Sequence, residues 1–392
     1  MHTTIPSSLP SAAPSADWPS LSAVLCHDWL TGMRGGERVL ELLCEGFPSA
    51  PIYTLLANPG TVSKSISSHP IHTSWLQHIP SIEDKYRALL PLFPAAIRSL
   101  HPPPAEVVIS TSSCVAKSII PHPRSRHLCY CFTPMRYAWT FYEEYFGGSP
   151  IKGLIARPLL AWLRRWDRRT ADRVDLFVAI SQHVRERIKT FYGREADVVY
   201  PPVDTVRCTP GPTAGTCDFD LIVSAMVPYK RIDLAIDAYN QLGYPLKIVG
   251  VGGKRAELAA RAMPNITFEG WRSDDEVLAL YRHCRLLIFP GEEDFGIVPL
   301  EAQACGKPVV AYGKGGALET VKPGVSGIFF DRQTPDALSR AIIEAARHAW
   351  DPVAIRRHAE TFGTHAFIRG LSAAIEKCHN LPYRNMSLKR EE

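Results

Sequence analysis

The stretch from 286 to 306 constrains the fold more than any other part of the chain. Residues 286–289 form an apolar run, which predicts a buried strand of a parallel sheet. An acidic loop (residues 290–296) follows, and then a short helix with Pro299 in its first turn and Gly306 just past its end, positions that these two residue types favour. Because a strand leads directly into a helix, we expect a parallel sheet with helices on both faces.

The start of this helix is a candidate anion site. The first backbone N–H groups of a helix have no partner within it, and the helix dipole favours negative charge there, so a diphosphate would fit. Gly296 allows the backbone to approach such a ligand closely. Glu293 and Glu301 bracket the site with seven residues between them, and their carboxylates can accept hydrogen bonds from a sugar or a ribose. Acidic loops and acidic first turns also occur for stability alone, so both interpretations stay open.

The alternation of strands and helices extends over most of the chain. Besides 286–289, strands are predicted at 21–27, 106–111, 127–132, 174–180, 219–224, 246–249 and 265–268. A Pro/Gly-rich stretch at 210–216 is typical of a linker. The chain of 392 residues is long enough for two domains. We therefore expect an α/β protein with a disordered tail at 1–20, two doubly wound lobes at 21–205 and 206–362, and a last helical segment at 363–392.

Composition excludes several classes of protein. The net charge of +5 is too small to predict nucleic-acid binding. Ten cysteines are scattered without the spacing of a zinc site, which predicts reduced thiols. The sequence has no apolar run of about 18 residues, and its first 20 residues lack the basic start and apolar core of a signal peptide. These features predict a protein of the cytosol.

The acidic loop and its helix resemble a known family signature. The pattern Glu293-x-Phe295-Gly296 followed after four residues by Glu301-Ala302 is similar to the donor site of the family 4 glycosyltransferases, which have the two-lobed GT-B fold. The resemblance implies that Glu293 faces the transferred sugar and that Glu301 holds the ribose of a nucleotide-sugar donor. It also implies that the donor's diphosphate lies along the loop and the helix start, at Phe295, Gly296, Ile297 and Val298, with Asp294 as a further donor-binding residue. In this fold the first lobe binds the acceptor, the second binds the donor, and the last helix, here 366–377, crosses back to the first lobe.

A glycine turn (residues 32–36) lies between the first predicted strand and a helix that opens at Gly35-Gly36. Such a turn can bring backbone close to a phosphate, although a plain tight turn has the same sequence. The run from His27 to Glu37 resembles the opening of bacterial mannosyltransferases of the same family that build surface polysaccharides. The resemblance implies that Gly35 and Gly36 face the donor.

The segment 129–139 is similar to the same mannosyltransferases but departs from them at one position. Phe132 stands where the family usually has a histidine that contacts the transferred sugar. His127 lies five residues earlier and is expected to be structural. The departure favours an alternative in which the chain binds a nucleotide sugar without catalysis.

Lys230 and Arg231 follow the first strand of the second lobe. Cations at this edge of a sheet can neutralise a diphosphate leaving group, whereas a Lys-Arg pair taken alone is usually a surface pair. The segment resembles the family's phosphate-binding stretch, which assigns the phosphate contact to Lys230. Many members have an arginine where this chain has Ala225, and Arg231 is the candidate replacement.

Three further features have more than one interpretation. The basic segment (residues 152–173) carries seven cations interleaved with Trp162, Trp166 and leucines. This pattern fits a helix that binds an anionic membrane surface and an ordinary solvated helix equally well. Asp218-Phe219-Asp220 matches a metal-binding pattern, but it lies at the start of a strand, so we expect no metal and no cofactor. Trp271 is either a base-stacking side chain or a core residue.

The leading hypothesis is a metal-independent, retaining hexosyltransferase, most readily a mannosyltransferase using GDP-mannose. Its acceptor would be lipid-linked or a saccharide, in polysaccharide synthesis at the inner face of a membrane. Glu293 and Lys230 are the expected catalytic residues. The alternatives are a nucleotide-sugar epimerase of the same fold, which the loop signature does not support, and a nucleotide-sugar-binding protein that has lost activity.

Overall fold

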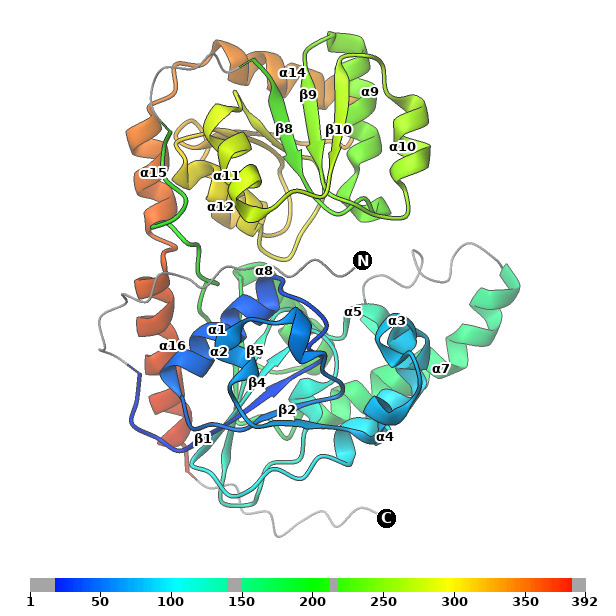
Figure 1. Ribbon diagram of the computed structural model, residues 1–392, viewed down its shortest axis with the longest axis vertical. Coiled ribbons are helices and arrows are strands. Elements are labelled where there is room, and N and C mark those ends of the chain that lie inside the picture. The colour runs from blue at the N-terminus through cyan, green and yellow to red at the C-terminus, as the bar shows by residue number, and fades with distance from the viewer. Residues whose placement is uncertain (1–17, 140–149, 212–217, 383–392) are drawn as a thin grey trace.

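The structure is a computed structural model that describes residues 18–139, 150–211 and 218–382, with residues 150–156 described by their backbone alone. Most of the tail predicted at 1–20 and of the linker predicted at 210–216 lies outside these ranges. The described chain forms two lobes, each a parallel sheet with helices packed on it, and Figure 1 shows the second lobe above the first. The predicted α/β fold with two doubly wound lobes is confirmed.

The first lobe contains a seven-stranded parallel sheet in the order β3-β2-β1-β4-β5-β6-β7. Its strands are β1 Ala23–His27, β2 Ile52–Thr54, β3 Ile71–Thr73, β4 Val107–Ser112, β5 Arg126–Cys131, β6 Leu176–Ala179 and β7 Ala196–Val198. The central strands are buried along their whole length, as expected for strands covered on both faces. The strand order reverses between β1 and β4, so the loops after these strands open a crevice at the sheet's carboxyl edge.

The helices of the first lobe differ widely in length. The α-helices are α1 Gly35–Gly46, α2 Lys64–Ser67, α3 Ile82–Lys85, α4 Phe93–Arg98, α5 Arg136–Trp139, α7 Pro150–Ala171 and α8 Gln182–Tyr192, and the 3-10 helices are η1 Pro59–Thr61, η2 Trp75–His78, η3 Tyr86–Leu92 and η4 Ala116–Ser118. Ser181 caps α8 by accepting a hydrogen bond from the Val184 N–H. Gly193, at φ 67°, ends the same helix in the left-handed region that glycine favours.

The second lobe contains a six-stranded parallel sheet in the order β10-β9-β8-β11-β12-β13. Its strands are β8 Asp220–Val223, β9 Leu246–Val249, β10 Ile266–Gly270, β11 Leu287–Phe289, β12 Val309–Tyr312 and β13 Gly327–Phe330. Its helices are η5 Pro228–Lys230, α9 Ile232–Leu242, α10 Arg255–Arg261, α11 Asp274–His283, α12 Ile297–Ala304, α13 Ala317–Thr320 and α14 Pro335–Arg347. The strand order reverses between β8 and β11.

Two helices at the end of the chain join the lobes. Helix α15 (Pro352–Glu360) packs against α12 of the second lobe, and α16 (Thr364–His379) packs against β4, β5 and β6 of the first. Phe367 of α16 meets Tyr130 of β5 edge to face, with ring centroids 5.7 Å apart. Figure 1 shows this pair running down one side of both lobes. The crossover predicted for 366–377 is therefore confirmed.

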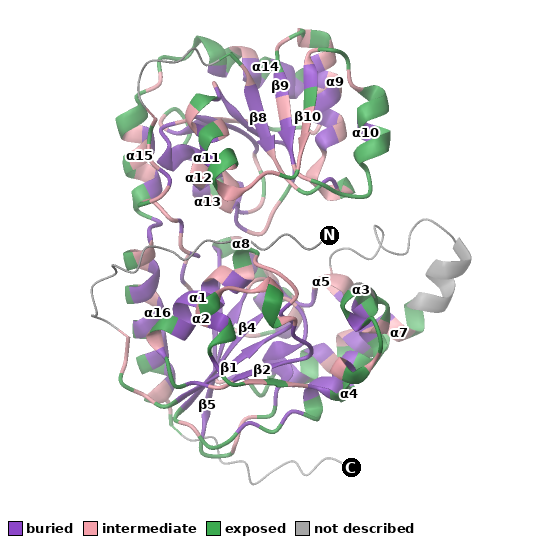
Figure 2. Ribbon diagram, viewed as in Figure 1, coloured by how far each residue is buried: buried purple, intermediate pink, exposed green. Residues whose placement is uncertain are grey.

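The strands are more deeply buried than the outer helices. Figure 2 shows the strands of both lobes largely in the buried class and α10 with an exposed outer face. Asp220 is buried at the start of β8, where its carboxylate pairs with Arg285 and accepts the Tyr239 hydroxyl, so this aspartate ties the sheet to its helices. Trp271 is 54% exposed, so its interpretation as a core residue is wrong. No described helix is both long and apolar enough to span a bilayer.

Candidate functional site

The candidate site lies at the carboxyl ends of β8 and β11, neighbouring strands where the second sheet reverses its order. The loop after β8 carries Lys230, and the acidic loop after β11 carries Glu293. Gly291 allows these loops to pack closely, because a Cβ there would lie 2.7 Å from the Tyr229 carbonyl oxygen. Ligands of open α/β sheets bind at such reversal points.

Lys230 and Glu293 form an ion pair between Nζ and Oε1, and their side chains are 16% and 21% exposed. The sequence places these residues far apart, and the fold brings them together. Each neutralises the other, while both remain partly accessible from the crevice. An incoming diphosphate would compete with Glu293 for the lysine, and a sugar hydroxyl could then donate to the carboxylate.

The start of α12 has the geometry expected of an anion site. Gly296 precedes the helix at φ 105°, a conformation that favours glycine, and no described side chain caps this end. The Glu293 carbonyl accepts a hydrogen bond from the Gly316 N–H at 2.8 Å. A Cβ at Gly316 would lie 2.2 Å from the Phe295 Cα, so the turn before α13 supports the acidic loop from behind.

Glu301 is half-buried in α12, where its Oε2 accepts a hydrogen bond from the Tyr281 hydroxyl at 2.9 Å. Burial raises the pKa of this carboxyl above its ordinary value, and the Tyr281 hydrogen bond opposes that rise. The interface between the lobes is close by, since Arg38 of α1 pairs with Asp274 of α11 at 2.6 Å. Sequence reasoning missed Tyr281, whose place is set by the packing of α11 on α12.

The glycine turn of the first lobe lies against the start of α12. A Cβ at Gly35 would be 3.2 Å from the Ile297 Cδ1, and a Cβ at Gly36 would be 3.2 Å from the Phe132 Cε2. The absence of a side chain at Gly35 therefore allows the first lobe to approach the second at the candidate site, whereas its absence at Gly36 leaves room for the Phe132 ring within the first lobe. Of the predicted donor-contacting residues, the structure brings Gly35 and Ile297 together directly.

Phe132 follows β5 and packs beside His27, with ring centroids 6.5 Å apart and the planes nearly perpendicular. The His27 Nδ1 lies 2.6 Å from the Thr111 Oγ1, and its Nε2 lies 4.0 Å from the Glu37 Oε1. An imidazole is thus present beside Phe132, although it is buried. His127 is fully buried and bonded to Ser110 at 2.9 Å, the structural place expected for it.

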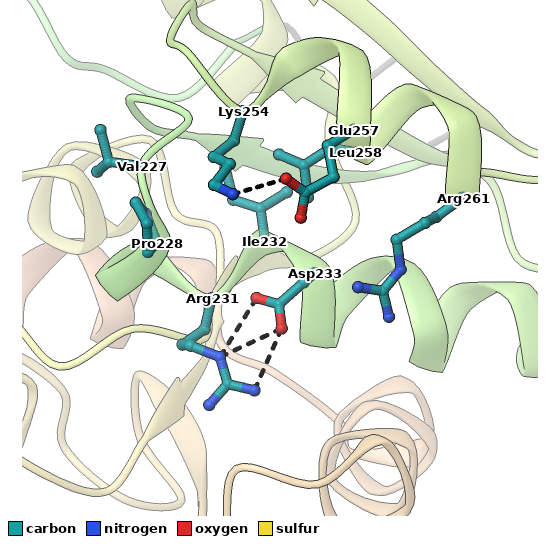
Figure 3. A pocket seen from close by; sticks show the side chains of 9 residues that line it. All are labelled: Val227, Pro228, Arg231, Ile232, Asp233, Lys254, Glu257, Leu258 and Arg261. Carbon is teal, nitrogen blue, oxygen red and sulfur yellow. Dashed lines mark hydrogen bonds and ion pairs between the residues drawn. The ribbon is translucent and has the colours of Figure 1, made fainter. Parts of the chain in front are cut away.

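Arg231 lines a pocket of its own lobe. Its Nε lies 3.2 Å from the Asp233 Oδ1, and its Nη1 donates to the Gln333 Oε1 at 3.1 Å. The pocket holds about 280 Å³, and Figure 3 shows Arg231 beside Asp233 on one wall and Lys254 beside Glu257 on another. The role of Arg231 as a second phosphate cation stays a prediction.

Asp294 points out of the second lobe into the first. Its Oδ2 accepts from the Arg136 Nη2 at 2.7 Å, and its Oδ1 is paired with the Arg187 Nη1. The carboxylate is 10% exposed. Sequence reasoning missed both arginines, although Arg136 lies in the segment 129–139 that resembles the mannosyltransferases. That resemblance was the available signal for Arg136, whereas nothing in the pattern of α8 singled out Arg187.

Two parallel-sheet lobes that share a crevice define the GT-B class of proteins, and solved structures agree. The apo form of the lipopolysaccharide outer core galactosyltransferase WaaB aligns over 91% of this chain and 99% of its own, with a TM-score of 0.64 and 16% identity. Anabaena Alr3699/HepE in complex with UDP aligns over 90% and 100%, with a TM-score of 0.66 and 17% identity. At these identities the likeness concerns the fold alone.

Family models match both lobes. Residues 33–207 match Glycosyltransferase Family 4, and residues 216–360 match Glycosyl transferases group 1. The first lobe is therefore a Glycosyltransferase Family 4 domain and the second a Glycosyl transferases group 1 domain, in a chain with the GT-B fold, as the sequence motifs indicated.

Curated relatives match over part of their length. An uncharacterised glycosyltransferase of Methanocaldococcus jannaschii is 31% identical over 175 residues, 43% of this chain and 49% of the relative. The GDP-mannose-dependent alpha-(1-6)-phosphatidylinositol monomannoside mannosyltransferase of Mycobacterium tuberculosis is 30% identical over 207 residues, 45% of this chain and 54% of the relative. The chain thus spans about half the length of the curated relatives it matches.

Proposed function

We propose that this chain is a retaining glycosyltransferase that moves a hexose, most readily mannose from GDP-mannose, onto a lipid-linked or saccharide acceptor. The observation that carries the proposal is the Lys230–Glu293 pair at the reversal point of the second sheet. Glu301 lies on the helix that follows, and the glycine turn of the first lobe faces the start of that helix. Lys230 suits a diphosphate, Glu301 suits a ribose hydroxyl and Glu293 suits a hydroxyl of the transferred sugar.

The groups have separate roles in the proposed reaction. Lys230 and the backbone N–H groups at the start of α12 stabilise the negative charge that grows on the diphosphate as the bond from the sugar C1 to the phosphate oxygen breaks. Glu293 accepts a hydrogen bond from the sugar and orients it. The acceptor oxygen forms the new bond to C1 on the same face, and its proton passes to the departing diphosphate. No protein base is required, which suits a site with Phe132 in place of histidine.

The choice of mannose and of GDP is supported by the name of the mycobacterial relative, a GDP-mannose-dependent mannosyltransferase. Structural neighbours have been solved with UDP and with UDP-glucose, so the uridine donors are the natural competitors. Incubation with GDP-mannose and UDP-glucose in parallel, with and without saccharide and lipid-linked acceptors, tests the choice by release of the nucleotide diphosphate. We expect faster release from GDP-mannose, unchanged by a chelator. Strict dependence on Mg²⁺ or Mn²⁺ would show that a metal neutralises the phosphates.

A second candidate function is nucleotide-sugar binding without catalysis, and Phe132 favours it. This candidate predicts that the protein binds GDP or UDP yet releases no nucleotide diphosphate from any donor. Conversion of the donor into an epimer without an acceptor would instead indicate the epimerase. The same incubation therefore separates all three functions.

We also propose that helix α7 brings the protein to the inner, cytoplasmic face of an anionic membrane, where a lipid-linked acceptor would be found. Trp162 is 46% exposed, and the exposed cations Arg165, Arg168 and Arg169 follow it at helical spacing. Arg164 differs, because its Nε donates to the Ala138 carbonyl at 2.6 Å and its guanidinium lies over Trp139. The side chain of Lys152 lies outside the described residues.

Co-sedimentation with vesicles containing phosphatidylserine tests this surface. Each cation near an anionic leaflet contributes about 1 kcal/mol at modest ionic strength, so replacing Arg165, Arg168 and Arg169 with glutamine should remove most binding. Donor binding should be unchanged, because α7 lies outside the crevice. The matched control replaces Arg340, Arg347 and Arg357 of the second lobe with glutamine. Equal sedimentation of both variants and the wild type would make the basic segment an ordinary solvated helix.

A further inference from the structure

The acidic loop carries two adjacent carboxylates, Glu293 and Asp294, that pair with cations from different lobes. Glu293 pairs with Lys230 of its own lobe. Asp294 pairs with Arg136 of α5 and Arg187 of α8, both in the first lobe. Glu293 therefore pairs within its own lobe at the crevice, whereas the adjacent Asp294 pairs across the interface between the lobes.

Asp294 is held more firmly than an ordinary surface carboxylate. Its backbone carbonyl accepts the Ser181 hydroxyl at 2.6 Å, and the same serine caps α8. Its side chain is 10% exposed, whereas the Arg38–Asp274 pair elsewhere between the lobes is 35% and 40% exposed. Exposed pairs contribute little, but removing the partner of a buried charge is costly. Among these two contacts, the one at Asp294 is thus the stronger constraint on lobe arrangement.

The same contact fixes the peptide that bears Glu293. The carbonyl of Glu293 is bound by the Gly316 N–H from the second lobe, and the carbonyl of Asp294 is bound by Ser181 from the first. Glu319 adds a second link, since its carboxylate accepts from the N–H groups of Gln182 and His183 at 2.7 and 3.1 Å. The position of the Glu293 side chain in the crevice therefore depends on how the first lobe docks.

We infer that Asp294, with Arg136 and Arg187, is a latch that sets the closed arrangement of the lobes and thereby positions Glu293. Asp294 is then a positioning residue, distinct from the diphosphate contacts at the start of α12. This inference rests on the proposed function for its kinetic consequence, but the lobe arrangement itself can be measured without any reaction.

The test compares Asp294→Asn with the wild type. Asparagine keeps the shape but removes the charge, so two guanidinium groups face each other without a carboxylate and the lobes should separate. We expect a larger radius of gyration in small-angle X-ray scattering. Turnover should fall about a hundredfold, the loss typical of a misplacement near 1 Å. Affinity for GDP, measured by calorimetry, should change far less, and Asp294→Glu should recover part of both effects.

Arg187→Gln and Arg185→Gln form a matched pair on helix α8. Arg187 holds Asp294, whereas Arg185 pairs with Glu186 at 3.5 Å on an exposed surface. Arg187→Gln should shift scattering and turnover in the same direction as Asp294→Asn but less, because Arg136 remains. Arg185→Gln should match the wild type. If Asp294→Asn fails to fold, Arg187→Gln carries the test.

Three outcomes would overturn the inference. If Asp294→Asn has the same scattering and the same turnover as the wild type, Asp294 is not a latch. A variant with open lobes and normal turnover would show that closure does not position Glu293. If the Asp294→Asn variant scatters normally but loses both turnover and GDP affinity, Asp294 contacts the donor directly. A wild type that releases no nucleotide diphosphate would refute the proposed function, while scattering alone would still decide whether the latch exists.

Discussion

The two lobes share one fold plan but contribute different chemistry to the crevice. The second lobe supplies charged groups from its own strand ends and from the helix that follows, namely Lys230, Glu293 and Glu301. The first lobe brings two glycines and Phe132 to the same place, and two of its arginines are engaged by Asp294. We therefore propose that the second lobe holds a charged ligand and that the first lobe closes over it.

The lobes also differ in regularity. In the second lobe, helices follow strands with short connections throughout the described residues. In the first lobe, a run of short helices and turns, η2, α3, η3 and α4, separates β3 from β4. Irregular segments above a rigid sheet are where proteins of one fold vary their ligands. We therefore propose that the second lobe carries the common part of the reaction and that the first lobe selects the acceptor.

The largest expected effect is that of Lys230→Ala in the second lobe. The charge on the diphosphate grows as the glycosidic bond breaks, so the lysine matters more for turnover than for binding. We expect kcat to fall about a hundredfold, the loss typical of removing one preorganised charge-stabilising group. Lys254→Ala is the control, because Lys254 pairs with Glu257 on the wall of the separate pocket. A change confined to KM would contradict the proposed role.

Glu293→Gln should come next. Glutamine keeps the shape but weakens the hydrogen bond to the sugar, so turnover should fall at least about tenfold with little change in donor affinity. Glu292→Gln provides the comparison, since Glu292 is the neighbouring carboxylate and is 42% exposed. Because Glu293 and Lys230 are paired, the double variant should lose less than the product of the two single losses. Fully additive losses would show that the pair does not act together.

Sequence patterns predicted the fold well where strands were long or apolar. The predicted strands at 219–224 and 246–249 correspond to β8 and β9, and that at 106–111 corresponds to β4. The patterns missed β2, β3 and β7, which have three residues each, because so short a run shows no periodicity. They also missed β13, whose four residues include a glycine. β11 also has three residues but was predicted, because it lies in an unbroken apolar run that leads directly into the acidic loop and a helix.

Local spacing predicted the candidate site only in its linear part, although the family resemblance also assigned Lys230, Gly35 and Gly36 to it. The loop signature singled out Glu293 and Glu301, but their partners lie elsewhere in the chain. Tyr281 is 20 positions from Glu301, and Arg136 is 158 positions from Asp294. Such pairs depend on the order of strands in the sheets and on the docking of the lobes, neither of which a single sequence encodes in its spacing.

Glu301 should affect donor affinity rather than turnover. Glu301→Ala removes the acceptor of a ribose hydroxyl and should cost about 1–3 kcal/mol in the binding of GDP. The raised pKa of Glu301 adds a pH dependence, because the carboxyl takes up a proton at a higher pH than usual and then accepts hydrogen bonds less well. GDP affinity of the wild type should therefore fall as the pH is lowered toward the raised pKa of Glu301, and the fall should begin above the pH at which an ordinary glutamate carboxyl takes up its proton. Calorimetric titrations at several pH values measure both effects.

Two variants sharpen the prediction for Glu301. In Glu301→Gln the position cannot ionise, so this source of pH dependence should disappear. In Tyr281→Phe the hydrogen bond that lowers the pKa of Glu301 is lost, so the fall in affinity should begin at a higher pH than in the wild type. A wild type and a Glu301→Gln variant with the same pH profile would remove Glu301 from the ribose site.

The smallest effect is expected from the first lobe, in Phe132→His. The ring of Phe132 lies beside Gly36 and His27, and an imidazole of similar shape fits the same space, so we expect the variant to fold. Turnover should also stay close to that of the wild type, because the departing diphosphate takes the acceptor proton and the second lobe stabilises the charge. NMR of the product should show retained configuration at the anomeric carbon in both proteins. An inverted product would refute the same-face reaction. A wild type that is silent with every nucleotide sugar but gains activity with Phe132→His would show that the first lobe, and not the second, decides whether this chain is a catalyst.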